Sequence, residues 1–306
     1  MAARVRRKVR WPLLACLPVV VAIARKRRDI GLPRAVSVPL AVSAPLIVAA
    51  GLPRSRARDA LLWAAQMWAY KVEFEIPYDR PDSLRRRLHI DYPHRADALL
   101  GAGAEPGRRL QRALRRPPDL TVLDKAVSGL YATWEAEPHL WLAWILVRHR
   151  DRFPRAAARL AATFDLTLLG YWLVPTAPPW WAGSNGHMPH VRRIMVETGK
   201  KVWGRHWEPL YDSLGTNPFA AMPSLHFATS VMAAHVLGDT GRTAGALGWA
   251  YAGTLGFALV YLGEHYVADL LAGLALAEGV RRAAPRAAPA VRGVQRAIQR
   301  LEPRRT

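Results

Sequence analysis

Long apolar stretches alternate along this chain with short joints that are rich in arginine. The joints include Arg4 to Arg10, Arg25 to Arg28, Arg54 to Arg58 and Arg148 to Arg155. A surface helix of a soluble protein places apolar and charged residues three or four positions apart, whereas here the two classes are segregated. Segregation of this kind is typical of membrane-spanning helices and their flanks. The pattern therefore predicts an all-α fold, a polytopic membrane helix bundle.

Six apolar stretches predict the core transmembrane helices of this bundle. The second is unusually polar because it contains Glu135, Glu137 and His139, so we expect it to face the bundle interior or to start at the interface. In chain order, the six stretches are Ala57 to Tyr70, Ala126 to Val147, Ala156 to Trp172, Pro223 to Gly238, Thr243 to Leu262 and Tyr266 to Val280.

Two further apolar stretches near the start of the chain predict an N-terminal hydrophobic hairpin. Trp11 to Ala24 is shorter than the roughly 20 residues that a spanning helix needs, and Leu32 to Leu52 contains three prolines, which we expect to kink it. If both stretches crossed the membrane, Arg25 to Arg28 would lie outside, against the positive-inside tendency. A crossing hairpin and a re-entrant or interfacial hairpin therefore both remain open.

These stretches divide the chain into three parts. We expect residues 1–56 to form a basic N-terminal segment with two apolar stretches, and residues 57–282 to form the membrane core. Residues 283–306 form a basic tail in which arginine alternates with alanine and proline. We expect this tail to be cytoplasmic, and either disordered or lying on the membrane surface. With the C-terminal arginines inside, His226 and His265 both fall on the external face.

The net charge of +21 comes from 44 lysines and arginines against 23 acidic residues. Such an excess also suits nucleic-acid binding, but the basic residues cluster beside apolar runs, as they do where loops face anionic lipid heads. We therefore expect membrane lipids as partners and no nucleic acid. The single cysteine, Cys16, excludes an intrachain disulfide and a thiolate metal site. The composition, rich in Ala, Arg and Pro, indicates a GC-rich bacterial genome, so we expect this membrane to be the plasma membrane of a bacterium.

Two short motifs suggest phosphoryl transfer. His265 and Asp269 are four residues apart, so they share one face of a helix, and the carboxylate can hold the imidazole in one tautomer. A neutral imidazole nitrogen attacks phosphorus without charge repulsion and forms a phosphoramidate. His226 follows the helix-start signal Pro223-Ser224 and can protonate the leaving oxygen. Ser224 can donate a hydrogen bond to a phosphate oxygen beside free backbone N–H groups.

Other interpretations of these residues remain open. A His and an Asp at this spacing often form a plain local hydrogen bond, and Pro-Ser before an apolar run is often only a helix start. Two histidines and one carboxylate also suit non-haem iron, although we expect no metal and no cofactor here. What favours catalysis is the conjunction of both motifs at helix ends on one side of the membrane.

Basic clusters in the external loops suggest an anionic substrate. Candidate phosphate-binding residues are Arg80, in the loop Glu73 to Asp119, and Arg192, Arg193 and Lys201, in the loop Thr176 to Met222. External basic clusters oppose the usual topogenic trend, so they need another explanation. An amphipathic helix lying on an anionic membrane surface is an equal alternative.

The two motifs in their wider context carry a family resemblance. Ala221-Met222-Pro223-Ser224-Leu225-His226-Phe227-Ala228 and the stretch from Gly263 to Gly273 resemble the second and third signature motifs of the phosphatidic acid phosphatase type 2 superfamily. They are most similar to its inositolphosphotransferase branch, which includes inositol phosphorylceramide synthases. The segment Pro175 to Trp181 is similar to one that precedes the second motif in that branch. The resemblance covers about residues 57–282.

The resemblance implies a six-helix membrane bundle that needs no metal. It implies His265 as nucleophile, Asp269 as its partner and His226 as acid. Two departures from the family pattern concern phosphate binding. The phosphatases' first motif, a Lys followed after six residues by Arg-Pro, is absent, and the Ser-Arg of the third motif is replaced by Ala258-Leu259.

We therefore expect an integral-membrane lipid phosphotransferase or phosphatase that works through a phosphohistidine at the external face. The resemblance implies a phospholipid or isoprenoid phosphate substrate and an activity similar to inositol phosphotransfer. The alternative is a non-enzymatic lipid-phosphate transporter or flippase, in which Glu135 and Glu137 would couple to ions. The sequence leaves the oligomeric state undetermined.

Overall fold

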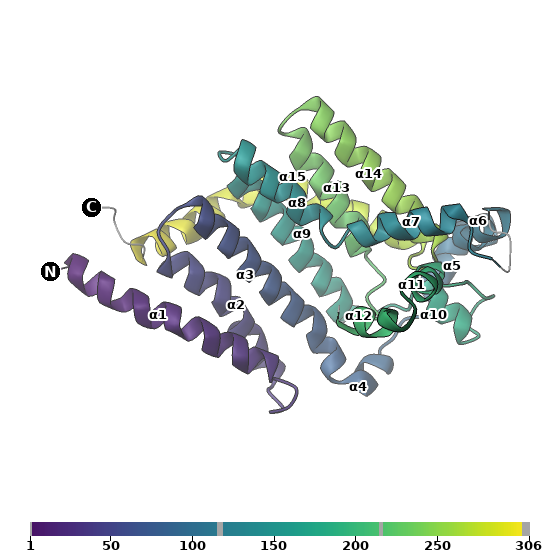
Figure 1. The fold of residues 1–306 in the computed structure, drawn as a ribbon, viewed down its shortest axis with the longest axis horizontal. Helices are drawn as coiled ribbons and strands as arrows, with labels where there is room; N and C mark the ends of the chain where they lie inside the picture. Colours follow the sequence, from purple (N-terminus) through teal and green to yellow (C-terminus); the bar gives the residue numbers. More distant parts are fainter. Residues whose placement is uncertain (1, 115–118, 214–216, 302–306) are drawn as a thin grey trace. The chain divides into compact units, whose positions relative to one another are not determined.

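The computed structural model describes residues 2–114, 119–213 and 217–301, and the regular structure in these ranges is helical, which confirms the all-α prediction (Figure 1). The helices are α1 (Ala2–Arg25), α2 (Arg34–Gly51), α3 (Arg56–Glu75), α4 (Pro81–Arg85), α5 (Asp91–Leu100), α6 (Pro106–Leu114), α7 (Val122–Thr133), α8 (Glu137–Arg148), α9 (Phe153–Leu173), α10 (Pro179–Ser184), α11 (Ile194–Trp203), α12 (Trp207–Ser213), α13 (Leu225–Gly238), α14 (Arg242–Tyr261) and α15 (Val267–Leu301), with short 3-10 turns η1 (Ile76–Asp79) and η2 (Gly204–His206).

The chain folds as two compact units, residues 1–80 with 281–306, and residues 81–280. In the first unit, α1, α2 and α3 pack side by side and antiparallel (Figure 1). Small residues line their contacts, including Ala24, Ala41 and Ala69, which are almost fully buried. The predicted N-terminal hairpin is therefore a pair of helices. The second of these, α2, is assigned as one helix through Pro39 and Pro45.

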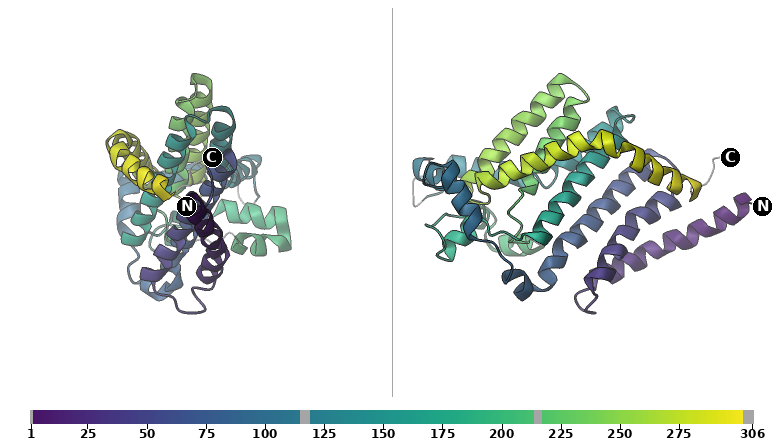
Figure 2. Two further views of the ribbon diagram at one scale, coloured as in Figure 1. Left: turned by 90° about the vertical axis from the view of Figure 1, so that its left-hand side faces the viewer. Right: turned by 180° about the vertical axis from the view of Figure 1, so that it is seen from behind.

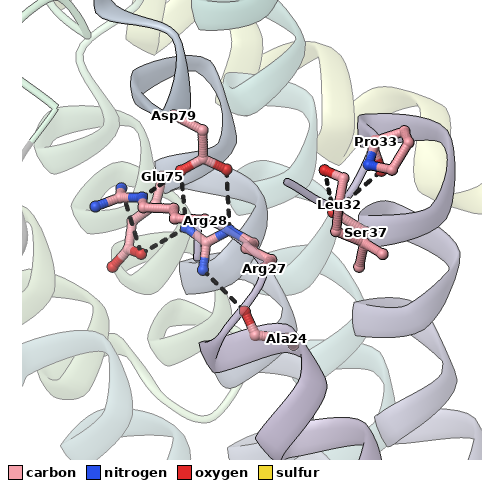
Figure 3. Close-up of polar contacts among 8 residues, drawn as sticks. All are labelled: Ala24, Arg27, Arg28, Leu32, Pro33, Ser37, Glu75 and Asp79. Carbon is pink, nitrogen blue, oxygen red and sulfur yellow. Dashed lines mark hydrogen bonds and ion pairs between the residues drawn. The ribbon is translucent and has the colours of Figure 1, made fainter. Parts of the chain in front are cut away.

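Arginines in the turn between α1 and α2 are paired with acids at the end of α3 and of η1 (Figure 3). The guanidinium of Arg27, only 5% exposed, donates to Asp79 at 3.1 Å and to Glu75 at 2.8 Å. Arg28 donates to the same Asp79 carboxylate. Two of the four cations from residue 25 to residue 28 are thus matched by carboxylates, which weakens the charge argument against placing this turn outside the membrane.

In the second unit, α13 is the central helix. It packs against α8, α9 and α14, and every residue from Ala228 to Ala234 is buried, which explains why its sequence is apolar on all sides. Figure 2 shows α13 and α14 side by side as an antiparallel hairpin. Their axes approach closely because Gly248 faces Ala234, where an added Cβ would lie 2.7 Å from the Ala234 Cα.

One predicted helix is wrong. The stretch Ala126 to Val147 is not one helix but two, α7 and α8, separated at Trp134–Ala136. Pro138 stands at the start of α8, where a proline begins a helix favourably and disfavours continuation of the one before it. In the basic tail, residues 283–301 continue α15 as a helix, and its place on the membrane surface remains a prediction.

Two helices in the described part of the chain, α2 and α14, are long and apolar enough to cross a membrane. The helical bundle is thus confirmed, while six core spans with an N-terminal hairpin remain a prediction.

Candidate active site

The second motif forms the start of α13. The hydroxyl of Ser224 accepts a hydrogen bond from the Phe227 N–H at 3.4 Å, so Ser224 is the N-cap of the helix. Its side chain is fully buried. His226 follows in the first turn. Phosphate binding by Ser224 remains a prediction beside this capping role.

The third motif forms the corner between α14 and α15. Gly263 has a φ of +79°, and an added Cβ would lie 2.6 Å from the Arg192 carbonyl oxygen, so only glycine fits this turn without strain. His265 then lies just before α15, and Asp269 lies in its first turn. Asp269 Oδ2 accepts hydrogen bonds from His265 Nδ1 at 3.1 Å and from the Tyr266 N–H at 2.9 Å.

The structure brings the two histidines together. His226 Nδ1 lies 3.2 Å from His265 Nε2. Because Asp269 binds the Nδ1 proton of His265, the Nε2 of that ring carries the free lone pair and accepts from His226 Nδ1. His265 is 4% exposed and Asp269 is fully buried. The three residues therefore form one chain of hydrogen bonds, with Nε2 of His265 facing the second imidazole.

Side chains and backbone from other helices hold the start of α13 beside α15. The Tyr171 hydroxyl of α9 donates to the Pro223 carbonyl at 2.9 Å and accepts from the Leu225 N–H at 3.1 Å. The Ser224 N–H donates to the Asp269 carbonyl at 3.0 Å. Gly273 of α15 allows this approach, since an added Cβ would lie 2.7 Å from the Ser224 carbonyl oxygen. Tyr171 is not among the predicted site residues, because it lies 52 residues before Pro223 and nothing in its local sequence indicates this role.

Two aromatic rings from the α7 end cover His226. The Trp134 ring lies 4.1 Å from the imidazole, centroid to centroid, and the Tyr131 ring lies 5.1 Å from it. Trp134 Nε1 donates to the Thr229 hydroxyl at 2.9 Å, which fixes the indole. These residues were also missed, because their position depends on the break between α7 and α8.

Of the predicted phosphate-binding residues, Arg193 is joined to the third motif. Its guanidinium makes two hydrogen bonds to Glu264, at 2.8 and 3.1 Å, and one to the Tyr211 hydroxyl at 2.6 Å. It also lies 4.1 Å above the Trp180 ring. Burial by itself lowers the pKa of Arg193, but the Glu264 carboxylate outweighs burial, so the pKa is raised and the side chain stays charged.

The other predicted phosphate-binding residues have different surroundings. Arg192 is paired with Glu197, with Nε to Oε1 at 2.7 Å. Lys201 is 58% exposed and lies 4.0 Å from Asp119. Arg80 is exposed at the end of η1 and belongs to the N-terminal unit. No contact joins them to the histidines among the described residues, so their role remains a prediction.

A second carboxylate reaches the start of α15. Asp97 of α5 is 1% exposed, and its Oδ1 accepts from the Ala268 N–H at 3.2 Å. Burial raises the pKa of Asp97 to about 6, with smaller contributions from the nearby Asp269 and Glu105 carboxylates, although backbone hydrogen bonds act in the opposite direction. The helix start is thus capped by a group that titrates close to neutral pH.

Comparison with known proteins gives two matches. The sequence model of the PAP2 (phosphatidic acid phosphatase type 2) superfamily matches residues 94–280. The chain is 30% identical over 167 residues to a phosphoinositol dihydroceramide synthase of Bacteroides thetaiotaomicron, which covers 51% of this chain and 53% of that protein. The chain therefore aligns with about half the length of this curated relative. No solved structure matches.

Proposed function

The chain belongs to the PAP2 superfamily, as its motifs indicated, and from this premise we propose that it is an integral-membrane lipid phosphotransferase or phosphatase that works through a phosphohistidine at His265. The family and the synthase relative support a phosphatase or phosphotransferase activity in general. The observation that carries the specific mechanism is the hydrogen-bonded chain His226, His265 and Asp269, at 3.2 and 3.1 Å.

In the first step, His265 Nε2 attacks the phosphorus of a lipid phosphate ester. The phosphate replaces the hydrogen bond between the two rings. As the P–N bond forms and the bond from phosphorus to the leaving oxygen breaks, protonated His226 gives its Nδ1 proton to that oxygen. Asp269 holds the Nδ1 proton of His265 and stabilises the positive charge that develops on the ring.

In the second step, an acceptor hydroxyl loses its proton to His226 and attacks the same phosphorus. The P–N bond breaks, His265 is regenerated as a neutral imidazole, and His226 is again protonated for the next cycle. If the acceptor is an alcohol the reaction is transfer, and if it is water the reaction is hydrolysis. The same residues serve both reactions, so exclusion of water decides between them.

Arg193 is our candidate for the phosphate-binding cation. Within the described residues its Nε and Nη2 are used by Glu264 and Tyr211, whereas Nη1 makes no hydrogen bond. Glu264 directly precedes His265, so this guanidinium is tied to the catalytic corner. A planar cation with a free N–H group suits a phosphate oxygen. Arg193 would thus replace the arginine missing at Leu259.

Membrane embedding is supported by apolar side chains on the outside of the second unit. Large apolar residues are exposed on three of its helices, α8, α9 and α14, where water would disfavour them and lipid would cover them. They are Leu140, Val147, Leu166, Leu169, Leu173, Leu247, Trp249 and Phe257. We propose a bacterial plasma membrane, with the catalytic corner outside and the C-terminus in the cytoplasm.

The likeness to a phosphoinositol dihydroceramide synthase suggests the first substrates to test: a phosphoinositol lipid as donor and dihydroceramide as acceptor. The purified protein in proteoliposomes is incubated with labelled phospholipids and polyprenyl phosphates, with and without each acceptor. Alkaline quenching then traps phosphohistidine, which is mapped by mass spectrometry. We expect label on His265.

Two variants make this test decisive. His265→Ala should abolish turnover and labelling, whereas His190→Ala, which changes an exposed loop histidine, should leave both unchanged. Full turnover by His265→Ala would refute the mechanism. Lipid translocation without turnover, unaffected by His265→Ala, would instead support the transporter alternative.

A further inference from the structure

The segment from Lys200 to His206, here named the basic tip, is exposed at every residue. It comprises the end of α11 and the turn η2. Lys200 and Lys201 are 59% and 58% exposed, and Val202 and Trp203 are 60% and 55% exposed. Arg205 completes a set of three permanent cations around two large apolar side chains. A soluble surface rarely presents this combination, since an exposed tryptophan beside cations is typical of a lipid interface.

The base of the basic tip is firmly packed. Ile194 and Met195, at the start of α11, belong to a buried cluster with Tyr261 and Leu262 at the end of α14. The Trp207 ring returns against Gly199, where an added Cβ would lie 2.3 Å from it. The tip is therefore a protrusion with a fixed base rather than a loose loop.

The same base includes the catalytic corner. Arg193 directly precedes α11, and its guanidinium binds both Glu264, next to His265, and Tyr211 of α12. The hairpin formed by α11 and α12 thus connects the tip at one end with the proposed phosphate-binding arginine at the other.

The charges of the basic tip are available to a ligand. Lys200 lies 3.5 Å from Glu208 and Lys201 lies 4.0 Å from Asp119, but these acids are 76% and 87% exposed. Exposed pairs of this kind contribute little and exchange readily with other anions. Arg205 Nε donates to Nε2 of its neighbour His206 at 3.4 Å.

We propose that the basic tip binds the anionic phospholipid head groups of the surrounding bilayer, with Val202 and Trp203 in the interfacial layer. This proposal rests on the proposed membrane location. Anionic phospholipid is the ligand that fits both properties of the tip: its phosphates bind the three cations, and the head-group layer accommodates the indole of Trp203. The hairpin then holds Arg193 at the level of the lipid phosphates, where the substrate bond lies. Lys201 accordingly binds lipid head groups of the bilayer and not the phosphate that reacts.

The test places an environment-sensitive fluorophore, NBD, on the tip of the full chain in nanodiscs. Val202→Cys in a Cys16→Ser background gives a single labelling site and keeps Trp203. Two further sites serve as controls: Leu247→Cys, exposed on α14, for a lipid-facing position, and Asp151→Cys, 81% exposed, for a water-facing position. Nanodiscs contain phosphatidylcholine alone or phosphatidylcholine with phosphatidylglycerol.

When phosphatidylglycerol is present, we expect the fluorescence emission of NBD at position 202 to shift to shorter wavelength and to be quenched by lipid that carries a spin label on its head group. Lys200→Gln, Lys201→Gln and Arg205→Gln together should abolish this shift, as should high salt. Replacing Arg85, Arg86 and Arg95 by Gln removes the same charge elsewhere and should leave the shift unchanged. NBD at position 247 should be quenched by deep spin labels in every lipid mixture.

Other results have definite meanings. If NBD reports water at position 202 but lipid at position 247, the proposal for the basic tip is overturned, while the membrane location is still supported. NBD at position 202 could instead be shielded from water to the same extent with and without phosphatidylglycerol, and lose this shielding when each nanodisc holds one copy. That result would assign the basic tip to a contact between protein copies and would also overturn the proposal. Water at both positions would refute the membrane location itself.

Discussion

The hydroxyl of Tyr171 donates to the carbonyl of Pro223 at 2.9 Å and, at 3.1 Å, accepts the N–H of Leu225, so one side chain of α9 fixes both sides of the cap that precedes His226. The site therefore depends on a residue of α9, outside the two motifs. This arrangement leads to the first of five predictions.

Tyr171→Phe should destabilise the protein by about 1–3 kcal/mol, because it leaves a buried carbonyl and a helix-start N–H without their partner. It should also lower turnover, since His226 loses its fixed position. Thermal unfolding in detergent and the initial rate measure the two effects. Tyr251→Phe deletes a hydroxyl that contacts the exposed Thr133 and should change neither by much. Equal effects of the two variants would contradict the assigned role.

Gly273→Ala should push α15 away from the start of α13, because the new Cβ would lie 2.7 Å from the Ser224 carbonyl oxygen. We expect a loss of stability of about 1–3 kcal/mol and a lower rate. Gly279→Ala is the matched control on the same helix, where no heavy atom lies within 4 Å of the added Cβ. It should be neutral or stabilise by up to about 1 kcal/mol, because alanine favours a helix over glycine. A Gly273→Ala protein as stable and active as the parent would show that this contact does not matter.

Asp269→Asn should lower the rate of phosphohistidine formation by about 10²–10⁴-fold, because an amide neither fixes the Nδ1–H tautomer nor stabilises a charged ring. Rapid quenching after mixing with labelled lipid measures this step. Asp239→Asn, at the opposite end of α13, breaks an ion pair with Arg159 and serves as the control. A normal rate of labelling in Asp269→Asn would remove this carboxylate from the mechanism.

Asp97 should give the stability a recognisable pH dependence. Its pKa is raised from 3.8 in the unfolded chain to about 6 in the folded one, mainly by burial. The folded state thus holds the proton more tightly, so this contribution is fully present below pH 3.8 and is lost as the pH rises through about 6. Relative to the parent, Asp97→Asn should gain about 3 kcal/mol as the pH rises between these limits, since its amide oxygen can still accept the Ala268 N–H. Parallel stability curves for the two proteins, measured by unfolding in detergent, would contradict this.

Arg193→Gln should have two effects that a second substitution separates. It leaves Glu264, 7% exposed, without its cation, which should cost about 2–4 kcal/mol, and it should weaken inhibition by orthovanadate, a phosphate analogue. Combining it with Glu264→Gln should restore most of the stability but not the inhibition. Recovery of both in the double variant would make Arg193 a structural residue.

The structure confirms part of what the sequence predicted. Where a prediction from the sequence was wrong or incomplete, the cause is local. Apolar runs predicted the helices of the bundle because a long continuous apolar stretch can be recognised without knowledge of its packing partners. The boundary at Trp134–Ala136 was missed because the apolar run continues across it, although Pro138 was a usable signal. The helical continuation of the tail to Leu301 was missed because its composition resembles an unfolded segment.

The sequence alone indicated that His265 and Asp269 can form a hydrogen bond, because only four residues separate them, and the structure keeps this contact although His265 lies just before α15. What only the tertiary structure decided is which distant groups meet them. His226 joins the pair through contacts from Tyr171 and Gly273. Within the described ranges, Arg193 is the one of the four predicted cations whose side chain bonds to the third motif, through Glu264. Spacing along the chain determines which residues can touch within a helix. Contacts between helices depend on how many side chains from several helices pack together, so no single position in the sequence predicts them.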